Sequence, residues 1–415
     1  MLYSLCMAET LKIENFGPIK KANLKLGKTT IFIGEQSSGK STIAKLIAIF
    51  RDYTLLDALN PAVNINLSQL LNEKFKNYQL LLYFKKESSF HYENSFFSLS
   101  YQSKVFLIKP LGAYYDKIKE TKALFEAGDV LNSNDYKAWE QQIRENTKSD
   151  SPILRILNAS SEIYKIKMFF SYFSREVVKH SYYIPAERIL ISTLSKSIYA
   201  VLGGQITLPK FLIDFAGKYE HARNRQAELD IDVLGIKFSS IDGVDKISDN
   251  NIEIDISDAS SGIQSLIPLT VAVIGAKRDD HTLPFFETFV IEEPELNLYP
   301  STQLKLINFL AANCTHQGNE LVITTHSPYV LTALNNLIFA YKSAAKKPEQ
   351  KKKITKIIPE ASWLNPVEFK AYYVGKGTVK DIISKKTGLI GENHLDDASD
   401  EVRNAFYKLM EIYKD

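Results

Sequence analysis

Cysteine is scarce in this sequence, and its scarcity excludes two classes of protein. Among 415 residues, Cys6 and Cys314 are the only cysteines. A disulfide-stapled fold needs several cysteine pairs, and a thiolate-ligated metal cluster needs several cysteines close together. The sequence encodes neither, and we expect two reduced thiols in a cytoplasmic protein.

Long apolar runs are also missing. A helix that crosses a bilayer needs about 18 or more consecutive apolar residues. The apolar stretch 263–274 is interrupted by Gln264, Ser265 and Pro268. The first residues, MLYSLCMAET, lack the basic and apolar regions of a signal peptide. We therefore expect a soluble, cytoplasmic protein with no membrane partner.

An excess of one charge is absent too. The chain has 51 basic and 48 acidic residues, a net charge of +3, which is too balanced to indicate nucleic-acid binding by itself. Lysine is nevertheless concentrated locally, at Lys346, Lys347, Lys351, Lys352, Lys353 and Lys356. We expect these lysines to form a solvated loop, with a nucleic-acid contact as the alternative.

Strand-like and helix-like patterns alternate over most of the chain, and 45% hydrophobic residues allow a sizeable core. The length suggests two domains or one domain with a large insertion. We expect strands at 11–16, 22–26, 29–33, 181–184, 285–291 and 321–325, a hairpin at 236–256, and helices at 41–50, 210–228, 260–274 and 300–312. This alternation predicts an α/β core.

Residues 52–180 interrupt the alternation. Residues 79–110 are aromatic-rich and alternate in polarity, which predicts antiparallel strands. Residues 111–180 have helical spacing without sustained heptads. We therefore divide the chain into residues 1–51, the first half of the core; 52–180, an inserted β and mainly helical part; 181–340, the second half; and 341–415, a lysine-rich loop with a strand-and-helix tail.

A phosphate-binding loop follows the apolar strand at 29–33. The glycines of GEQSSGKST let backbone N–H groups surround phosphate oxygens, and the following helix adds its positive N-terminus. Lys40 is placed to reach the β- and γ-phosphates of ATP, and Ser41 to hold Mg²⁺. The strand before the loop and the amphipathic helix after it make a chance glycine turn a poor explanation. The predicted nucleotide-binding residues are Gly34, Glu35, Gln36, Ser37, Ser38, Gly39, Lys40, Ser41 and Thr42.

Two acids end the apolar strand at 285–291. A carboxylate at such a strand end can bind Mg²⁺, usually through water, and the next can polarise the attacking water. Paired acids after a strand are common, and only the phosphate loop upstream makes these two functional candidates. We assign Glu292 to the metal, together with Ser41, and Glu293 to the general base.

A histidine follows the next apolar strand, at 321–325. His326 at that strand end can hydrogen-bond the γ-phosphate or the attacking water, although a purely structural histidine is the alternative. The predicted catalytic residues are Lys40, Glu293 and His326.

The segment SSGIQ at 260–264 opens a helix and makes a second phosphate-binding surface. A serine, a glycine backbone and a helix N-terminus suit an anion, although two serines that only cap a helix are the simpler alternative. One subunit has no use for two such surfaces on one γ-phosphate, whereas a facing partner does. We therefore predict that Ser261, Gly262 and Gln264 contact the nucleotide of a second copy, in a homodimer or a larger oligomer built from dimers.

Together these motifs resemble the ABC-type ATPases of the SMC, RecF and OLD (overcoming lysogenization defect) group, of the AAA_15/AAA_21-like kind. Residues 13–17 (IENFG) resemble its early strand pair, 261–264 its S-G-x-Q signature and 323–328 (ITTHSP) its switch-histidine motif. Residues 292–300 (EEPELNLYP) resemble the E-E-P-E-x-H-L-H-P of OLD-like members, with asparagine and tyrosine in place of both histidines. The resemblance implies an ABC-type P-loop ATPase core with ATP and Mg²⁺ as cofactors.

Two further elements are expected from the resemblance. Residues 184–188 (IPAER) look like a family element for whose Glu187 and Arg188 the sequence gives no role. A Q-loop glutamine should also exist, and Gln102 is a candidate. The resemblance is carried by residues 8–50 and 181–340, and the stretch between them matches no family element.

The resemblance implies three functional hypotheses. No acidic D-x-D cluster follows residue 328, so we expect no TOPRIM nuclease of the kind that OLD proteins carry. Stand-alone ATPases of this kind resemble subunits of the anti-phage systems PARIS, Septu and some retrons, in which the ATPase controls a separate nuclease or toxin, with DNA or a phage protein as candidate trigger. A RecF/SMC-like repair or chromosome-maintenance ATPase is the alternative. A transporter subunit fits less well because of the long insertion.

Overall fold

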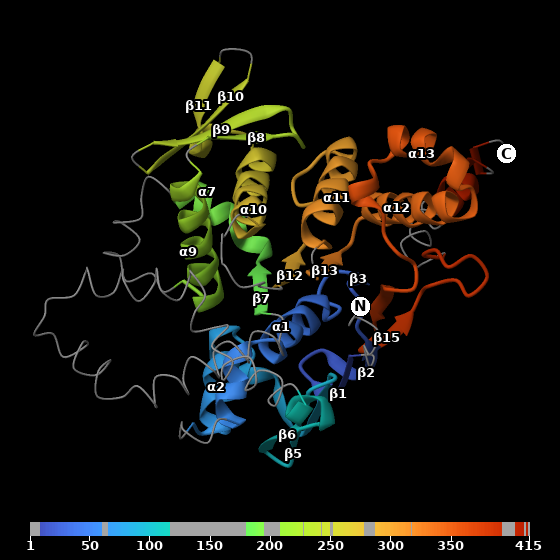
Figure 1. Cartoon of the computed structure of the whole chain (residues 1–415). Helices are drawn as coiled ribbons and strands as arrows, with labels where there is room; N and C mark the ends of the chain where they lie inside the picture. Colours follow the sequence, from blue (N-terminus) through green and yellow to red (C-terminus); the bar gives the residue numbers. More distant parts are fainter. Residues whose placement is uncertain are drawn as a thin grey trace, which may run out of the picture.

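The structure is a computed structural model that describes residues 9–59, 65–116, 180–194, 208–226, 228–241, 243–249, 252–277, 287–316, 318–391, 403–410 and 412–413. These residues form an 11-stranded sheet of order β6-β5-β4-β1-β2-β15-β14-β3-β13-β12-β7 and a four-stranded sheet of order β11-β10-β9-β8 (Figure 1). The mixture of sheets and covering helices confirms the predicted α/β class.

The elements have the following bounds. The strands are β1 (Thr10–Phe16), β2 (Ile19–Lys25), β3 (Thr29–Ile33), β4 (Phe84–Glu93), β5 (Phe97–Gln102), β6 (Val105–Pro110), β7 (His180–Ile184), β8 (Glu228–Ile231), β9 (Ile236–Ile241), β10 (Val244–Asp249), β11 (Ile252–Asp255), β12 (Glu287–Glu292), β13 (Glu320–Thr325), β14 (Phe369–Gly375) and β15 (Thr378–Asp381). The α-helices are α1 (Lys40–Phe50), α2 (Leu67–Asn77), α7 (Ile189–Leu194), α9 (Lys210–Arg225), α10 (Ser261–Lys277), α11 (Pro300–Cys314), α12 (Pro328–Lys346) and α13 (Lys351–Ile357). The 3-10 helices are η1 (Tyr53–Leu59), η2 (Leu81–Tyr83), η3 (Ala186–Arg188), η4 (Ile256–Asp258), η5 (Pro348–Gln350) and η6 (Glu360–Ser362).

The strands β14, β3, β13, β12 and β7 run parallel and form the half of the sheet that carries the motifs. β3 is buried along its whole length, as expected for a parallel strand covered on both faces. Phe32 packs on the α1 side, whereas Ile31 and Ile33 pack with α11 and α12. Because parallel strands end at one edge, the loops after β3, β12 and β13 lie together there.

The other half of the sheet is antiparallel, with β4 paired to β1 and β5 and β6 beyond it. The strands expected at 79–110 thus extend the sheet of β1 and β2. Phe16 lies at the centre of an aromatic cluster, with ring centroids 4.7 Å from Phe90 and 5.1 Å from Phe84. Residues 117–179, which hold most of the predicted helical insertion, lie outside the described residues. The four-part division of the chain stays a prediction.

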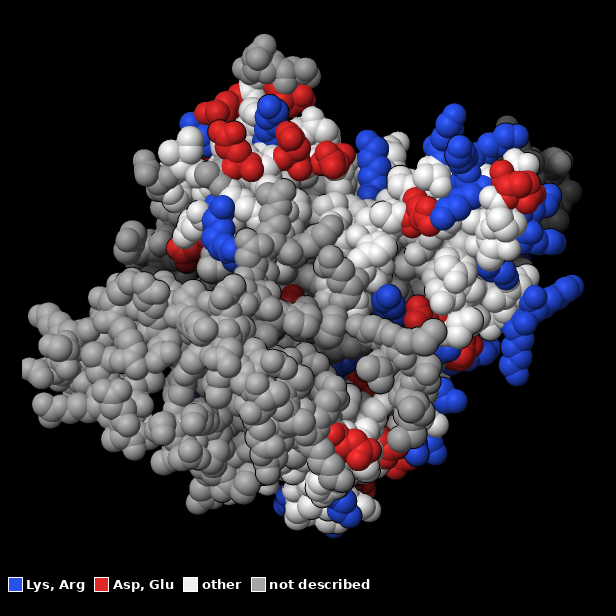
Figure 2. Space-filling model, in the orientation of Figure 1, with Lys and Arg blue, Asp and Glu red and all other residues white. Residues whose placement is uncertain are grey.

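The four-stranded sheet packs on α9 and α10 through a separate apolar cluster that includes Tyr219, Phe238 and Val271. The hairpin expected at 236–256 corresponds to β9 and β10, to which the structure adds β11. Acidic side chains gather over this sheet, and lysines gather over α12 and α13 (Figure 2).

The loop predicted for the lysine-rich segment is wrong, because α12 runs to Lys346 and residues 351–357 form α13. Lysine is a good helix former, and a charge-rich sequence does not exclude a helix. The lysines at 346, 347, 351–353 and 356 are all exposed, as the solvated interpretation predicts. No helix of the described part of the chain is both long and apolar enough to cross a bilayer.

Candidate functional site

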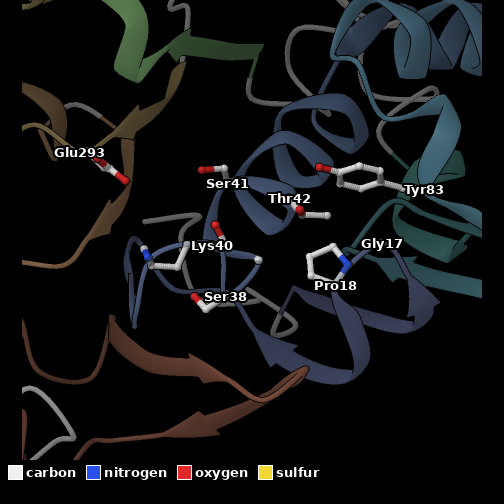
Figure 3. Close-up of a pocket in the computed structure, with 10 residues that line it drawn as sticks. Gly17, Pro18, Ser38, Lys40, Ser41, Thr42, Tyr83 and Glu293 are labelled. Atoms are coloured by element: carbon white, nitrogen blue, oxygen red, sulfur yellow. The ribbon is translucent and has the colours of Figure 1, made fainter.

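The loop between β3 and α1 lines a pocket of about 350 Å³ at the edge where the parallel strands end (Figure 3). The lining residues are Gly17, Pro18, Ser37, Ser38, Gly39, Lys40, Ser41, Thr42, Tyr83 and Glu293. Six of the predicted nucleotide-binding residues thus line one cavity, together with the predicted base. Gly34, Glu35 and Gln36 form the start of the same loop and do not line this cavity.

Lys40 begins α1, and its side chain folds back over the loop. Its Nζ atom donates hydrogen bonds to the carbonyl oxygens of Gly34, at 2.8 Å, and Glu35, at 2.7 Å. Burial lowers the pKa of Lys40, and the negative charge of Glu293 opposes that shift. Phosphate oxygens are stronger acceptors for an ammonium group than neutral carbonyls are. A bound phosphate can therefore replace both carbonyls as the partner of Lys40.

The backbone around Lys40 requires glycine and leaves a polar group free for a ligand. Gly39 has a φ of 108°, and a Cβ atom there would lie 2.5 Å from Cδ1 of Ile19. The hydroxyl of Ser38 is buried and has no hydrogen-bond partner among the described residues. A buried polar group without a partner is costly, so a ligand oxygen at this position would stabilise the loop.

Glu292 ends β12 and is 3% exposed. Its Oε1 atom accepts a 2.6 Å hydrogen bond from the hydroxyl of Tyr183. Burial raises the pKa of Glu292, while Lys45 and hydrogen bonds from Tyr183 and Ser41 oppose the rise. The structure thus brings together the two predicted Mg²⁺ ligands.

Two oxygen ligands fit Mg²⁺, which is commonly held by one or two protein oxygens together with substrate phosphates and water. The described residues contain no group of three or more His, Cys, Asp or Glu side chains that could hold a metal ion by themselves. Ser41 and Glu292 can therefore serve as the protein ligands of an Mg²⁺ ion that arrives with a nucleotide.

Glu293 stands at a sharp turn after β12, with a positive φ of 42° that is uncommon for a residue other than glycine. Its N–H donates to the carbonyl oxygen of Thr324 at 2.9 Å. Its carboxylate lies 3.7 Å from Nδ1 of His326, too far for a hydrogen bond but close enough for strong attraction. This contact with His326 lowers the pKa of Glu293, and the contact with Glu293 raises the pKa of His326. The pair favours an ionised carboxylate beside a protonated imidazole.

Glu295 has a role that the sequence did not reveal. This carboxylate is 5% exposed and accepts hydrogen bonds from the hydroxyl of Thr325, at 2.6 Å, and from the N–H of His326, at 3.0 Å. Glu295 therefore ties the turn after β12 to the end of β13. The position of Glu295, two residues after the predicted general base Glu293, is the signal in the sequence that points to this role.

The far end of the pocket is formed by residues that sequence reasoning missed. Tyr83 is 37% exposed and its ring lies 5.8 Å from that of Phe16. Gly17 has a φ of 53°, and its N–H donates to the carbonyl oxygen of Tyr83 at 3.0 Å. A Cβ atom at Gly17 would lie 2.4 Å from the Tyr83 ring. Tyr83 and Pro18 form one end of the pocket and Lys40 and Glu293 the other (Figure 3).

The signature segment does not line this pocket. Ser261 is exposed at the start of α10, and a Cβ atom at Gly262 would lie 2.7 Å from the carbonyl oxygen of Asn297. The amide of Gln264 donates to the carbonyl oxygens of Ser257, at 2.8 Å, and Ala259, at 2.9 Å. Gln264 thus holds the loop that leads into α10, while Ser261 is open to solvent.

Arg188 of the IPAER segment is completely buried, whereas Glu187 is exposed. The guanidinium of Arg188 donates hydrogen bonds to five carbonyl oxygens, those of Pro185 (3.1 Å), Ser265 (3.1 Å), Glu292 (2.8 Å), Glu293 (2.8 Å) and Pro294 (3.2 Å). Burial lowers the pKa of Arg188 to about 10, so the side chain is charged at neutral pH. Arg188 therefore connects α10 to the turn after β12 through hydrogen bonds.

The remaining sequence candidates lie away from the pocket. Gln102 is exposed at the end of β5 and does not line the cavity. Asn297 and Tyr299, which replace the two histidines of the OLD-like pattern, are exposed, and Tyr299 is 77% exposed.

Comparison with known proteins agrees with these motifs. A family model described as an AAA ATPase domain, AAA_15, matches residues 207–331, a span that contains the signature, the paired acids and His326 but not the phosphate loop. No curated protein matches the sequence.

Several solved structures are similar to the chain at low identity. The Smc head domain with an extended coiled coil from Pyrococcus furiosus is 11% identical, with a TM-score of 0.37 over 91% of this chain and 96% of that chain. The SMC head domain from Thermotoga maritima is 10% identical, with a TM-score of 0.36 over 91% and 98%. The recombination mediator protein RecF is 11% identical, with a TM-score of 0.32 over 91% and 98%. These values are too low to transfer a function.

The family match and the sheet-edge motifs define the class. Residues 207–331 match the model of an ATPase domain, and the strand that precedes the phosphate loop pairs with the strand that precedes His326, which in turn pairs with the strand that ends at Glu292. The described residues therefore form the α/β core with a phosphate loop that the sequence predicts, with an antiparallel β part attached.

Proposed function

We propose that the chain is an ATPase whose active sites are completed by two facing copies. The observation that carries the proposal is the single pocket shared by Lys40 and Glu293, which come from different motifs far apart in the sequence. A cation for the phosphates and an ionised carboxylate for the attacking water, beside one cavity, are two of the parts that nucleotide hydrolysis uses.

The triphosphate of ATP is proposed to lie along the phosphate loop, with its γ-phosphate towards Glu293. The N-terminus of α1, the hydroxyl of Ser38 and the ammonium group of Lys40 supply donors to its oxygens. Ser41 and Glu292 would hold Mg²⁺, which when bound neutralises charge on the β- and γ-phosphate oxygens.

Glu293 is proposed to accept the proton of the attacking water. The water oxygen then bonds to the γ-phosphorus, and the bond from that phosphorus to the bridging oxygen of ADP breaks. His326 keeps the carboxylate ionised and can donate a hydrogen bond to the transferred phosphate. Glu295 holds the backbone of His326 in place.

The adenine ring of ATP is proposed to lie against Tyr83 and Pro18, at the end of the pocket away from Glu293. An aromatic ring and a proline ring suit the flat faces of a base, and neither selects a charge. Gly17 permits this arrangement because a side chain there would collide with the Tyr83 ring.

A partner copy is proposed to supply the signature. Ser261 and Gly262 lie outside the pocket of their own chain, and the exposed start of α10 offers a serine hydroxyl and helix N–H groups to an anion elsewhere. In a two-fold dimer each signature would close over the partner's γ-phosphate.

A mixing experiment tests this composite site. Lys40→Ala should bind no ATP, because it loses the cation of the pocket, and Ser261→Arg should bind ATP but fail to hydrolyse it. A mixed dimer of the two variants has one intact composite site, and the ATPase rate should recover in part as the two proteins are mixed. Circular dichroism of each variant checks the fold. A Ser261→Arg protein that hydrolyses ATP at the native rate would overturn the composite site.

The biological setting remains a proposal with two forms. Control of a separate nuclease or toxin in anti-phage defence rests on the sequence resemblance, and a RecF/SMC-like role in DNA repair is equally supported. Pull-down of the proteins encoded next to this one, with and without ATP, distinguishes them. A neighbouring nuclease or toxin that is retained or released according to nucleotide favours defence, whereas ATP-dependent binding of DNA alone favours repair.

A further inference from the structure

Arg188 joins two parts of the chain that the proposed mechanism assigns to different active sites. On one side Nε donates to the carbonyl oxygen of Ser265, in the first turns of α10. On the other side Nη1 and Nη2 donate to the consecutive carbonyl oxygens of Glu292, Glu293 and Pro294. The signature that serves the partner's site and the acids that serve the chain's own site therefore share one fully buried side chain.

The attachment at the signature end is reinforced by a proline. Pro268 has no N–H group, so the carbonyl oxygen of Gln264, four residues earlier, loses its normal helical partner. The hydroxyl of Ser192 takes that place with a 2.8 Å hydrogen bond. Thr193 also lies 3.3 Å from Oε1 of Gln264, whose amide holds the loop before α10. The short helix α7, directly after Arg188, thus fixes the start of α10.

The attachment at the acidic end controls the backbone that aims the proposed base. Glu293 adopts a positive φ of 42°, a conformation that the surrounding structure must impose. Three of the five carbonyl partners of Arg188 belong to this turn. Gly262 also meets this turn, since a Cβ atom there would lie 2.7 Å from the carbonyl oxygen of Asn297. A shift of α10 therefore cannot leave the turn after β12 unchanged.

The chemistry of the side chain fits this role. A guanidinium has five N–H donors in a fixed plane, whereas an ammonium group has three on a flexible stem. The five hydrogen-bond partners of the guanidinium are backbone carbonyl oxygens. These bonds therefore fix the conformation of the main chain and do not form an ion pair. A lysine could keep the charge but could not hold both segments in one geometry.

We propose that Arg188 is a positioning residue for two active sites at once, joining the signature of one composite site to the base of the other. The inference rests on the proposed composite site. A chain that has closed its signature on the partner's nucleotide would thereby have its own Glu293 fixed for hydrolysis.

Mixed dimers with one working site test the proposal. One subunit keeps its own Glu293, and its partner carries Glu293→Gln, so turnover comes from a single site with a known base donor and a known signature donor. Two affinity tags select the mixed dimer. Arg188→Lys is then placed in either subunit. We expect the turnover rate to fall about 10-fold or more with either placement, while the ATP dissociation constant stays within about 3-fold of the wild type.

Arg51→Lys is the matched control, because Arg51 is also buried but lies at the end of α1 opposite Lys40. There it donates hydrogen bonds to Glu9 and Thr288. Loss of a buried arginine alone would lower the melting temperature in both variants, whereas only Arg188→Lys should slow the single site. An unchanged rate when Arg188→Lys sits in the signature donor would overturn the proposal, even if Ser261→Arg has shown the composite site to be correct.

A second variant keeps the test decisive if Arg188→Lys does not fold. Ser192→Ala removes the hydroxyl that donates to the carbonyl oxygen of Gln264. Placed in the signature donor, it should slow the single site by about 3-fold without changing ATP affinity. An unchanged rate would overturn the link between α7 and the signature.

Discussion

The hydroxyl of Tyr183 donates a 2.6 Å hydrogen bond to the carboxylate of Glu292. Tyr183 lies on β7, next to the strand that ends at Glu292, and the residue is 4% exposed. The bond gives the buried carboxylate a preferred orientation, so the orientation of the proposed Mg²⁺ ligand depends on a neighbouring strand.

We expect Tyr183→Phe to raise the Mg²⁺ concentration needed for half-maximal ATPase rate by about 10-fold, because ligands that lose an orienting partner bind metal more weakly. Titration of Mg²⁺ at fixed ATP measures the effect. Tyr182→Phe is the control, since this adjacent hydroxyl points to the carbonyl oxygen of Ala272 at 3.4 Å. Equal Mg²⁺ dependence in both variants would remove Tyr183 from the metal site.

Glu293→Gln keeps the shape of the side chain but removes the proton acceptor. We expect turnover to fall about 100-fold or more while ATP stays bound, because the carboxylate acts on the attacking water rather than on the nucleotide. Single-turnover hydrolysis and equilibrium binding separate the two effects. If Glu293→Gln is active and Glu292→Gln is not, the roles of the two acids are reversed.

Tyr83→Ala should weaken ATP binding about 10-fold, since stacking of a base on an aromatic ring contributes on the order of 1–3 kcal/mol. Binding of inorganic tripolyphosphate, which has no base, should be unchanged, and Tyr83→Phe should behave as the wild type. Tyr341→Ala is the matched control, because Tyr341 has the same 37% exposure but lies on α12 outside the pocket. Equal loss of ATP and tripolyphosphate binding would place Tyr83 elsewhere in the site.

Glu287 provides a prediction about stability and pH. Burial raises the pKa of Glu287 from 4.5 to about 7, and Lys218 opposes the rise. The folded state thus keeps a proton that the unfolded state loses, so stability should fall as pH rises from about 4.5 to 7. The Glu287→Gln protein cannot ionise there, and its stability should exceed that of the wild type at pH 8 by at most about 3 kcal/mol.

Urea unfolding at pH 5 and pH 8 measures the difference. The gain from Glu287→Gln should be small at pH 5 and large at pH 8. Glu349→Gln, at an exposed position of η5, is the control and should show no such gain. A Glu287→Gln protein with the same gain at both pH values would mean that the carboxyl group is not neutral in the folded state.

The core of the site was predictable because its signals are local. The sequence predicts the strand at 29–33 and the start of α1 within about one residue of their observed bounds. The glycines of the loop between them are equally plain in the sequence. The acids and His326 also follow buried strands whose apolar runs mark them in the sequence.

Other features depend on contacts between distant segments and left no local pattern. Tyr83 reaches the pocket only because β4 pairs with β1, which places η2 beside Gly17. Arg188 could be noticed as a motif, but its role requires the carbonyl oxygens of two other segments. Lysine composition predicts the exposure of the lysines between 346 and 356 but not the helices that carry them, because side-chain charge restricts backbone conformation only weakly.

The position of β14 has a consequence for the order in which the protein is made. β14 comes from residues 369–375 yet pairs with β3, and the carbonyl oxygen of Val374 lies 2.1 Å from the position that a Cβ atom of Gly34 would take. During synthesis the phosphate loop leaves the ribosome well before β14, the neighbour that closes this side of its strand. A nascent chain therefore exposes the unpaired apolar edge of β3 until β14 has emerged, and it should need a chaperone longer than a protein whose sheet forms in chain order.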